Sequence, residues 1–151
     1  MSSIIGNHVG GTRVSQTGGT LQDVYNPSTG EVSGQVRLSS SKELDDVVQV
    51  ASAAAVDWGA TPPSKRVQVM YRFKRLLEEN ADKVASSISS EHGKTHDDAL
   101  GEVSRGLEAV EFSCGIPHLL KGTFSEQVAT SIDVYSIPQS LGVVAGITPF
   151  N

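Results

Sequence analysis

Residues 141–147 read Leu141-Gly142-Val143-Val144-Ala145-Gly146-Ile147, a short continuous apolar run that is followed by Thr148-Pro149-Phe150-Asn151. Uninterrupted apolar runs of this length are typical of strands that are buried on both faces of a sheet. No helix, polar tail or cap follows the run. We therefore predict a buried strand here, and we expect the chain to be truncated where that strand leads into its next element.

The stretch before this run, residues 123–137, has a strand-like period. Ile132 and Val134 alternate with Asp133 and Tyr135, which predicts extended chain. Pro138 has no N–H for a ladder hydrogen bond and therefore indicates a strand end or an edge position.

Amphipathic helices are predicted upstream of this stretch. Ser40 and Glu43 have the spacing of a capping box, and the helix that they begin is expected to stop at Gly59. Thr61 before Pro62 is expected to cap a second helix. Asn80 is expected to cap a third helix, and Gly93 to end it.

A further helix is predicted from Thr95 to Gly122, with apolar residues on two sides. One side carries the longer stripe and the other carries Arg105, so we expect both faces to be covered. The stripe consists of Ala99, Val103, Leu107, Val110 and Cys114, and the second side adds Ala109 and Phe112 to Arg105.

Two strand-like runs between Leu21 and Leu38 flank the sequence Asn26-Pro27-Ser28-Thr29-Gly30. Proline presets the backbone for a turn, and glycine adopts positive φ without strain. This segment predicts a β-hairpin.

The composition is that of a water-soluble globular protein. The 151 residues are 38% hydrophobic and 19% charged, and no apolar run approaches the roughly 18 residues of a membrane span. A net charge of -5 without a basic cluster argues against nucleic acid and anionic membrane as partners. No leader pattern is visible, and a single cysteine fits a reducing compartment, so we expect a cytoplasmic protein that binds small molecules or other proteins.

Local patterns identify no clear catalytic group. Cys114 is a nucleophile by chemistry, but its place on the apolar stripe favours a packing role. His92 and His96 are four residues apart, but Gly93 separates them, so we expect no metal site.

Arg105 has two open interpretations. Its guanidinium suits a substrate carboxylate if the helix lines a cleft, whereas the spacing of Glu102 and Glu108 favours ordinary surface pairing. Asn151 after Pro-Phe is, on pattern alone, a frayed end.

Three segments stand in order along the chain: Tyr25-Asn26-Pro27-Ser28-Thr29-Gly30-Glu31, Glu91-His92-Gly93-Lys94-Thr95 with Asp98-Ala99, and Gly142 to Asn151. They resemble landmarks of the aldehyde dehydrogenase superfamily. Residues 105–122 and 135–139 look like its coenzyme-A-acylating methylmalonate-semialdehyde dehydrogenase branch. The resemblance implies an α/β fold in which residues 1–151 form the N-terminal portion of the NAD-binding domain, with a strand for homo-oligomer assembly at 123–138 and the first strand of the cofactor sheet.

The resemblance also implies a reaction. Malonate or methylmalonate semialdehyde is oxidised through a cysteine thiohemiacetal and thioester, hydride passes to NAD, carbon dioxide leaves, and coenzyme A takes the acetyl or propionyl group. Asn151 matches the asparagine whose amide donates to the oxyanion, an interaction typically worth about 3 kcal/mol. Thr148 and Phe150 match positions beside the cofactor, and Arg105 matches an arginine near the substrate carboxylate.

The catalytic cysteine, the glutamate base and the catalytic domain of this branch have no counterpart in residues 1–151. We therefore expect the chain alone to be inactive, and two hypotheses remain. It is either part of a longer dehydrogenase or a remnant that acts, if at all, as an assembly or binding module. In isolation it is expected to expose the helix face with Arg105 and Phe112, and both sides of the 141–147 strand.

Overall fold

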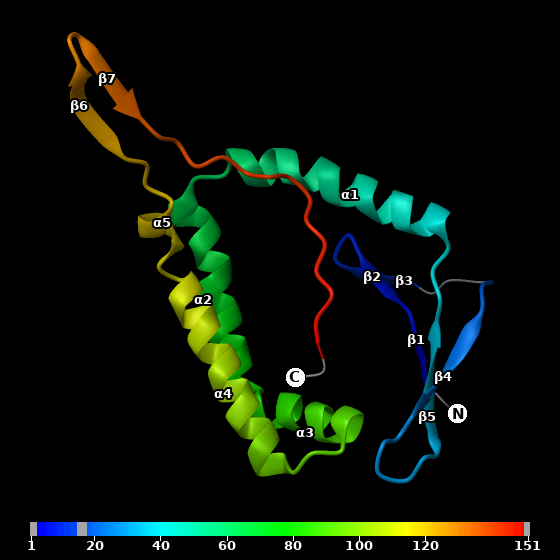
Figure 1. Ribbon diagram of the computed structural model, residues 1–151. Coiled ribbons are helices and arrows are strands. Elements are labelled where there is room, and N and C mark those ends of the chain that lie inside the picture. The colour runs from blue at the N-terminus through cyan, green and yellow to red at the C-terminus, as the bar shows by residue number, and fades with distance from the viewer. Residues whose placement is uncertain (1–2, 15–17, 150–151) are drawn as a thin grey trace.

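The protein is described by a computed structural model that covers residues 3–14 and 18–149. The strands that precede residue 40 lie on one side and a group of helices on the other, and the helix α1 (Ser41–Ala60) leads from the first group to the second (Figure 1). None of the described helices is long and apolar enough to cross a membrane. This mixture of helices and strands confirms the predicted α/β fold class.

The predicted hairpin is present as β4 (Leu21–Tyr25) and β5 (Val32–Arg37), which pair antiparallel. Its turn is closed by the Asn26 N–H, which donates to the Glu31 carbonyl at 2.8 Å, and by Gly30 at a φ of +73°. β1 (Ser3–Ile5) adds to β5 in parallel, giving the order β1-β5-β4.

A second hairpin, β2 (Asn7–Val9) with β3 (Thr12–Val14), was not predicted. Gly10 and Gly11 form its turn with φ angles of +58° and +79°. Positive φ at both central residues is typical of the tight turns that suit a twisted hairpin. The adjacent glycines Gly10 and Gly11 are therefore the sequence feature that could have predicted this hairpin.

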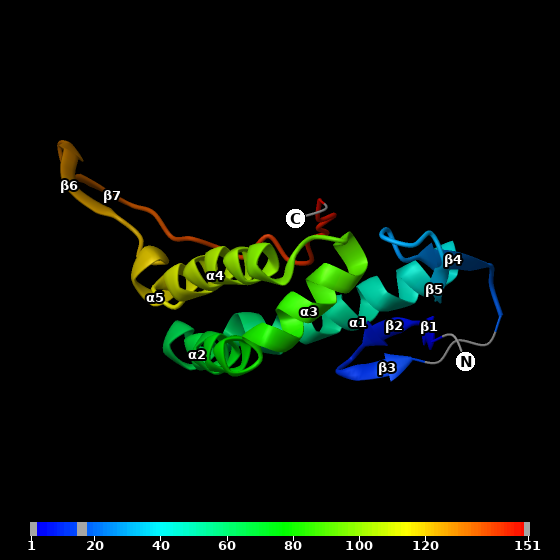
Figure 2. The ribbon, with the colours of Figure 1, turned by 90° about the horizontal axis from the view of Figure 1, so that it is seen from below.

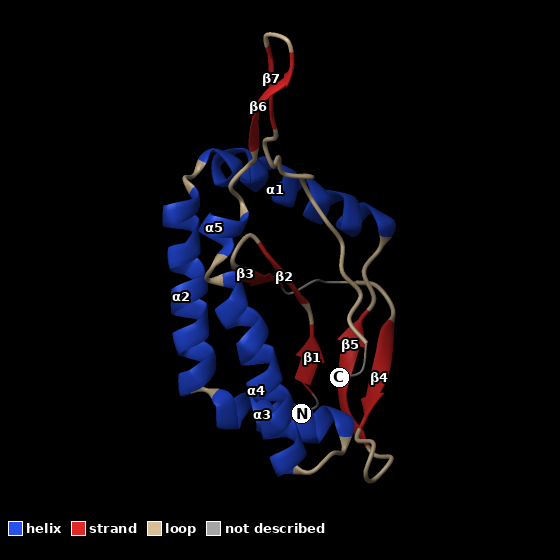
Figure 3. Cartoon of the chain, turned by 60° about the vertical axis from the view of Figure 1, so that its left-hand side comes forward, coloured by secondary structure: helices blue, strands red, loops and turns tan. Residues whose placement is uncertain are grey.

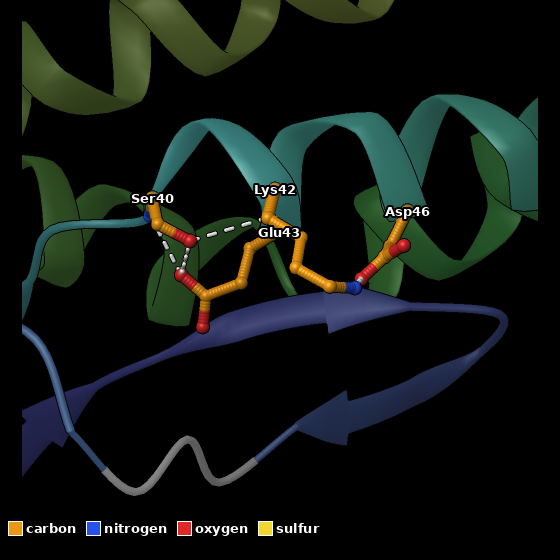
Figure 4. Close-up of polar contacts among 4 residues, drawn as sticks. All are labelled: Ser40, Lys42, Glu43 and Asp46. Atoms are coloured by element: carbon orange, nitrogen blue, oxygen red, sulfur yellow. Dashed lines mark hydrogen bonds and ion pairs between the residues drawn. The ribbon is translucent and has the colours of Figure 1, made fainter.

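The capping box of α1 is confirmed (Figure 4). The Ser40 N–H donates to Glu43 Oε2 at 2.6 Å, and the Glu43 N–H donates to Ser40 Oγ at 3.3 Å. These bonds hold the pKa of the Glu43 carboxyl below its ordinary value, the bond from the Ser40 backbone contributing most. The helix runs one residue past the predicted stop at Gly59.

One predicted N-cap was wrong, and a second is confirmed in position only. Thr61 donates its hydroxyl to the Asp57 carbonyl at 2.8 Å, so it closes α1 instead of capping α2 (Pro63–Glu79). Asn80 is the N-cap residue of α3 (Ala81–His92), as predicted, but its amide donates to the Leu76 carbonyl at 2.8 Å and its side chain makes no cap hydrogen bond. Both side chains therefore bond carbonyls at the end of the preceding helix, and the Leu76 carbonyl also accepts from the Asn80 N–H at 3.1 Å. Gly93 ends α3 at a φ of +76°, as predicted.

The last predicted helix is shorter than expected. α4 (His96–Ser113) starts after Thr95, whose hydroxyl accepts from the Asp98 N–H at 3.2 Å, and α5 (Ile116–Leu119) is separate. Pro117 has no N–H to continue α4, which explains why Gly122 does not end it. Gly122 lies at the base of a hairpin, where a Cβ would lie 1.8 Å from the Ser136 carbonyl oxygen.

Residues 123–138 were predicted as a single strand for subunit assembly, but they form two strands. The segment forms β6 (Phe124–Ala129) and β7 (Ile132–Tyr135), which pair with each other and project from the helices (Figure 3). Ser131, at a φ of +62°, reverses the chain between them. The strand ends before Pro138, as predicted. The role of this segment in subunit assembly stays a prediction.

The strand predicted at 141–147 is not formed. Residues 138–149 run without regular secondary structure, and Leu141 and Ile147 are 93% and 99% exposed. A strand needs a partner for its ladder hydrogen bonds, and no described strand lies beside this segment (Figure 1).

The core lies where α3 and α4 pack together, with α2 against α4 (Figure 2). Ala85, Ala99 and Val103 are buried, and Leu107 of the predicted stripe packs against them, so the first part of that stripe faces this core. The second face is not covered, since Phe112 is 70% exposed. The total exposed surface is 11663 Å², against roughly 7,400 Å² expected for a folded monomer of 15.9 kDa.

Replacing Ala99 with leucine is expected to destabilise the α3–α4 contact by about 1–3 kcal/mol, because the added carbons have no space between the helices. Urea unfolding followed by circular dichroism measures the loss. Ala53→Leu, at an exposed position of α1, is the matched control and should change little. Equal unfolding midpoints for the two variants would contradict the packing described.

The pKa of the Glu43 carboxyl is expected to lie below its ordinary value, and Ser40→Ala, which removes the hydroxyl donor but keeps the backbone N–H, should raise this pKa part of the way back. Because the folded-state pKa is lowered, the resulting stabilisation is present above the unfolded-state pKa and disappears as the pH falls through the folded value. NMR titration of the Glu43 side chain tests this, with Ser52→Ala in the same helix as control. An unchanged midpoint in Ser40→Ala would count against the capping interaction.

Candidate functional site

Arg105 lies on the exposed side of α4, at the wall of a depression between α3 and α4. The depression has a volume of about 780 Å³. Apolar side chains of the core form part of its lining, and charged side chains stand around them. The lining includes Leu77, Val84, Ser87, Ile88, Glu91, His92, Glu102, Val103, Gly106, Thr148 and Pro149.

Arg105 does not make the surface pairs that its spacing favoured. Within residues 3–14 and 18–149, no ion pair joins it to Glu102 or Glu108. Its guanidinium lies back over Gly101, where a Cβ would be 3.8 Å from Nη1. The group is therefore directed toward the N-terminal part of α4, as is usual for long side chains on helices.

Glu102 instead pairs with Lys94, which lies between the end of α3 and the start of α4. The Lys94 ammonium donates to Glu102 Oε1, and the two side chains are only 20% and 16% exposed. Sequence reasoning missed this pair. Eight residues separate its members and a loop intervenes, so no helical period connects them.

Thr148 reaches the same depression from the C-terminal segment, which passes close to α3 and α4 (Figure 1). The structure thus brings together two predicted site residues, Arg105 and Thr148, that are 43 positions apart in the chain. The other two, Phe150 and Asn151, lie outside the described residues.

The remaining candidates lie elsewhere. Cys114 is half-buried, and its thiol donates to the Val110 carbonyl at 3.4 Å, as suits a packing role. His96 Nε2 is 3.4 Å from Asp82 Oδ1. In the part of the chain that the structure describes, no three His, Cys, Asp or Glu side chains are placed to hold a metal ion.

Residues 13–151 match the Aldehyde dehydrogenase family, and the chain belongs to that family. Among curated relatives it is similar to a malonate-semialdehyde dehydrogenase of Pseudomonas aeruginosa, with 52% identity over 88% of this chain and 27% of the relative. A malonate-semialdehyde dehydrogenase of Geobacillus kaustophilus is 45% identical over 96% of this chain and 30% of the relative.

Solved structures give the same picture. A methylmalonate-semialdehyde dehydrogenase from Oceanimonas doudoroffii superposes with a TM-score of 0.92 and 47% identity, over 99% of this chain and 30% of that one. A Sinorhizobium meliloti protein assigned to the same activity, in complex with NAD, gives a TM-score of 0.93 and 47% identity over 100% and 31%. The chain spans about 30% of the length of these relatives.

Proposed function

We propose that the chain forms the N-terminal part of a longer NAD-dependent dehydrogenase, which converts malonate or methylmalonate semialdehyde and coenzyme A to acetyl-CoA or propionyl-CoA and carbon dioxide. One observation carries the proposal. Arg105 stands beside a depression shared with Thr148 and makes no described ion pair. The names of the relatives support the choice of substrate.

The proposed reaction balances without a further reactant. The aldehyde carbon loses hydride to NAD⁺ and gains a bond to the coenzyme A sulfur. The bond between the carboxylate carbon and the carbon next to the aldehyde breaks, and carbon dioxide leaves. The proton of the coenzyme A thiol is taken up by that second carbon. Arg105 would hold the carboxylate through two parallel N–H donors, which fixes the orientation of the aldehyde. Asn151 would donate its amide to the oxyanion that forms at the aldehyde oxygen.

The residues in this chain fit only part of an NAD site. Thr148 places a hydroxyl at the depression, and Phe150 follows two residues later. The 151 residues contain no Gly-x-Gly-x-x-Gly or phosphate-loop pattern. The proposal therefore assigns most of the NAD contacts, the nucleophile and the general base to the remainder of the enzyme.

In the full-length enzyme, Arg105→Leu is expected to raise KM for malonate semialdehyde at least tenfold, because a charge-assisted pair of hydrogen bonds is lost. KM for propanal, which has no carboxylate, should stay within about twofold, and Arg105→Lys should fall between. Steady-state kinetics with both aldehydes measures this. Equal losses for both aldehydes, or no loss, would overturn the assignment of Arg105.

The alternative function, an inactive module for assembly or binding, is favoured by the exposed apolar side chains at 141–147 and on β6 and β7. Intact mass of the natural protein separates the two hypotheses. The dehydrogenase proposal predicts about three times the 15.9 kDa of this chain, in a homo-oligomer. A mass near 15.9 kDa would support the alternative.

Expressed alone, the 151 residues should self-associate, and a monodisperse monomer in light scattering would contradict that.

A further inference from the structure

We propose that Lys94 is a positioning residue that holds Glu102 away from Arg105 and thereby keeps the guanidinium available for a carboxylated ligand. The inference rests on the proposed function, in which Arg105 binds the substrate carboxylate. It assigns a specific role to a residue that does not itself line the depression.

Glu102 is the natural competitor for Arg105. The two residues are three positions apart on α4, a spacing at which opposite charges meet on a helix surface. Both line the same depression. The guanidinium lies back over Gly101, toward the turn that carries Glu102. Without another partner, Glu102 would neutralise the group that the ligand needs.

Lys94 removes this competitor. Its ammonium binds Glu102 Oε1, and the low exposure of both side chains makes the pair stronger than an ion pair in open solvent. The position of Lys94 is set on both sides, by Gly93 with its positive φ and by Thr95, which caps α4. The ammonium is therefore held by the loop before α4, where it contacts Glu102.

The other charged groups at the depression do not take this role. Glu91 lines it from α3, and no ion pair joins Glu91 to Arg105 in the described ranges. Glu108 is three residues beyond Arg105 and does not line the depression. Glu102 is thus the carboxylate whose placement decides whether Arg105 is neutralised.

The test uses the full-length enzyme and four variants: Lys94→Met, Lys94→Arg, Lys94→Met with Glu102→Gln, and Lys42→Met as control. Lys42 forms an exposed pair with Asp46 on α1 (Figure 4), so its replacement removes the same charge from a residue that does not line the depression. KM and kcat are measured for malonate semialdehyde and for propanal. A crystal structure of Lys94→Met provides a readout independent of activity.

Lys94→Met is expected to raise KM for malonate semialdehyde about tenfold, the effect of losing a charge-assisted contact. KM for propanal should remain within twofold. Adding Glu102→Gln should restore KM for malonate semialdehyde to within about twofold, and Lys94→Arg and Lys42→Met should match the unmodified enzyme. In the Lys94→Met crystal the Glu102 carboxylate should lie within about 4 Å of the Arg105 guanidinium.

The outcomes separate this inference from the proposed function. If Lys94→Met has the same KM values as Lys42→Met while Arg105→Leu still raises KM for malonate semialdehyde, the role proposed for Lys94 is wrong and the proposed function stands. If Arg105→Leu has no effect, both fall. Equal losses for both aldehydes in Lys94→Met, without rescue by Glu102→Gln, would show a structural role and overturn the inference. If Lys94→Met does not fold, Lys94→Gln, which keeps an amide donor without charge, gives the same reading.

Discussion

The contact between α3 and α4 determines how the helical half is arranged. Ala85 and Ala99 have no exposed surface, and Val103 joins them one turn further along α4. Small side chains at a helix contact let the two backbones approach closely. Arg105 follows Val103 by two residues, which turns it to nearly the opposite side of α4, so it lies outside the core and its side chain lines the depression.

The rest of the chain buries little of its apolar surface. α1 has no buried residue and holds its shape through its capping box and internal hydrogen bonds. The hairpin of β6 and β7 and the segment at 141–147 expose nearly all their apolar side chains. An exposed area of 11663 Å², where roughly 7,400 Å² is expected, means that much of this surface suits contact with other protein. That agrees with a chain that spans about 30% of its relatives.

The features that sequence predicted correctly are local. The turn at 26–30, the capping box at Ser40 and the stop at Gly93 each depend on a few adjacent residues with specific backbone preferences. The errors concern competition between neighbours or partners. The side chains of Thr61 and Asn80 bond the end of the preceding helix instead of the start of the next one. A strand at 141–147 would need a neighbouring strand for its hydrogen bonds. At the site, the sequence pattern favoured an ion pair between Glu102 and Arg105. The actual partner of Glu102 is Lys94, which lies in a loop where helix spacing gives no information.

Two sequence segments that were recognised separately turn out to touch. A Cβ on Gly93 would lie 3.2 Å from Ser28 Oγ and 3.3 Å from Pro27 Cγ, so the turn of the β4–β5 hairpin packs against the end of α3. Glycine suits position 93 for two reasons: the backbone adopts a positive φ there, and a side chain would have little space. The hairpin turn thus supports the loop that carries Lys94, and through it the placement of Glu102 relative to Arg105. A short polar turn far away in sequence becomes part of what determines the charge at the candidate site.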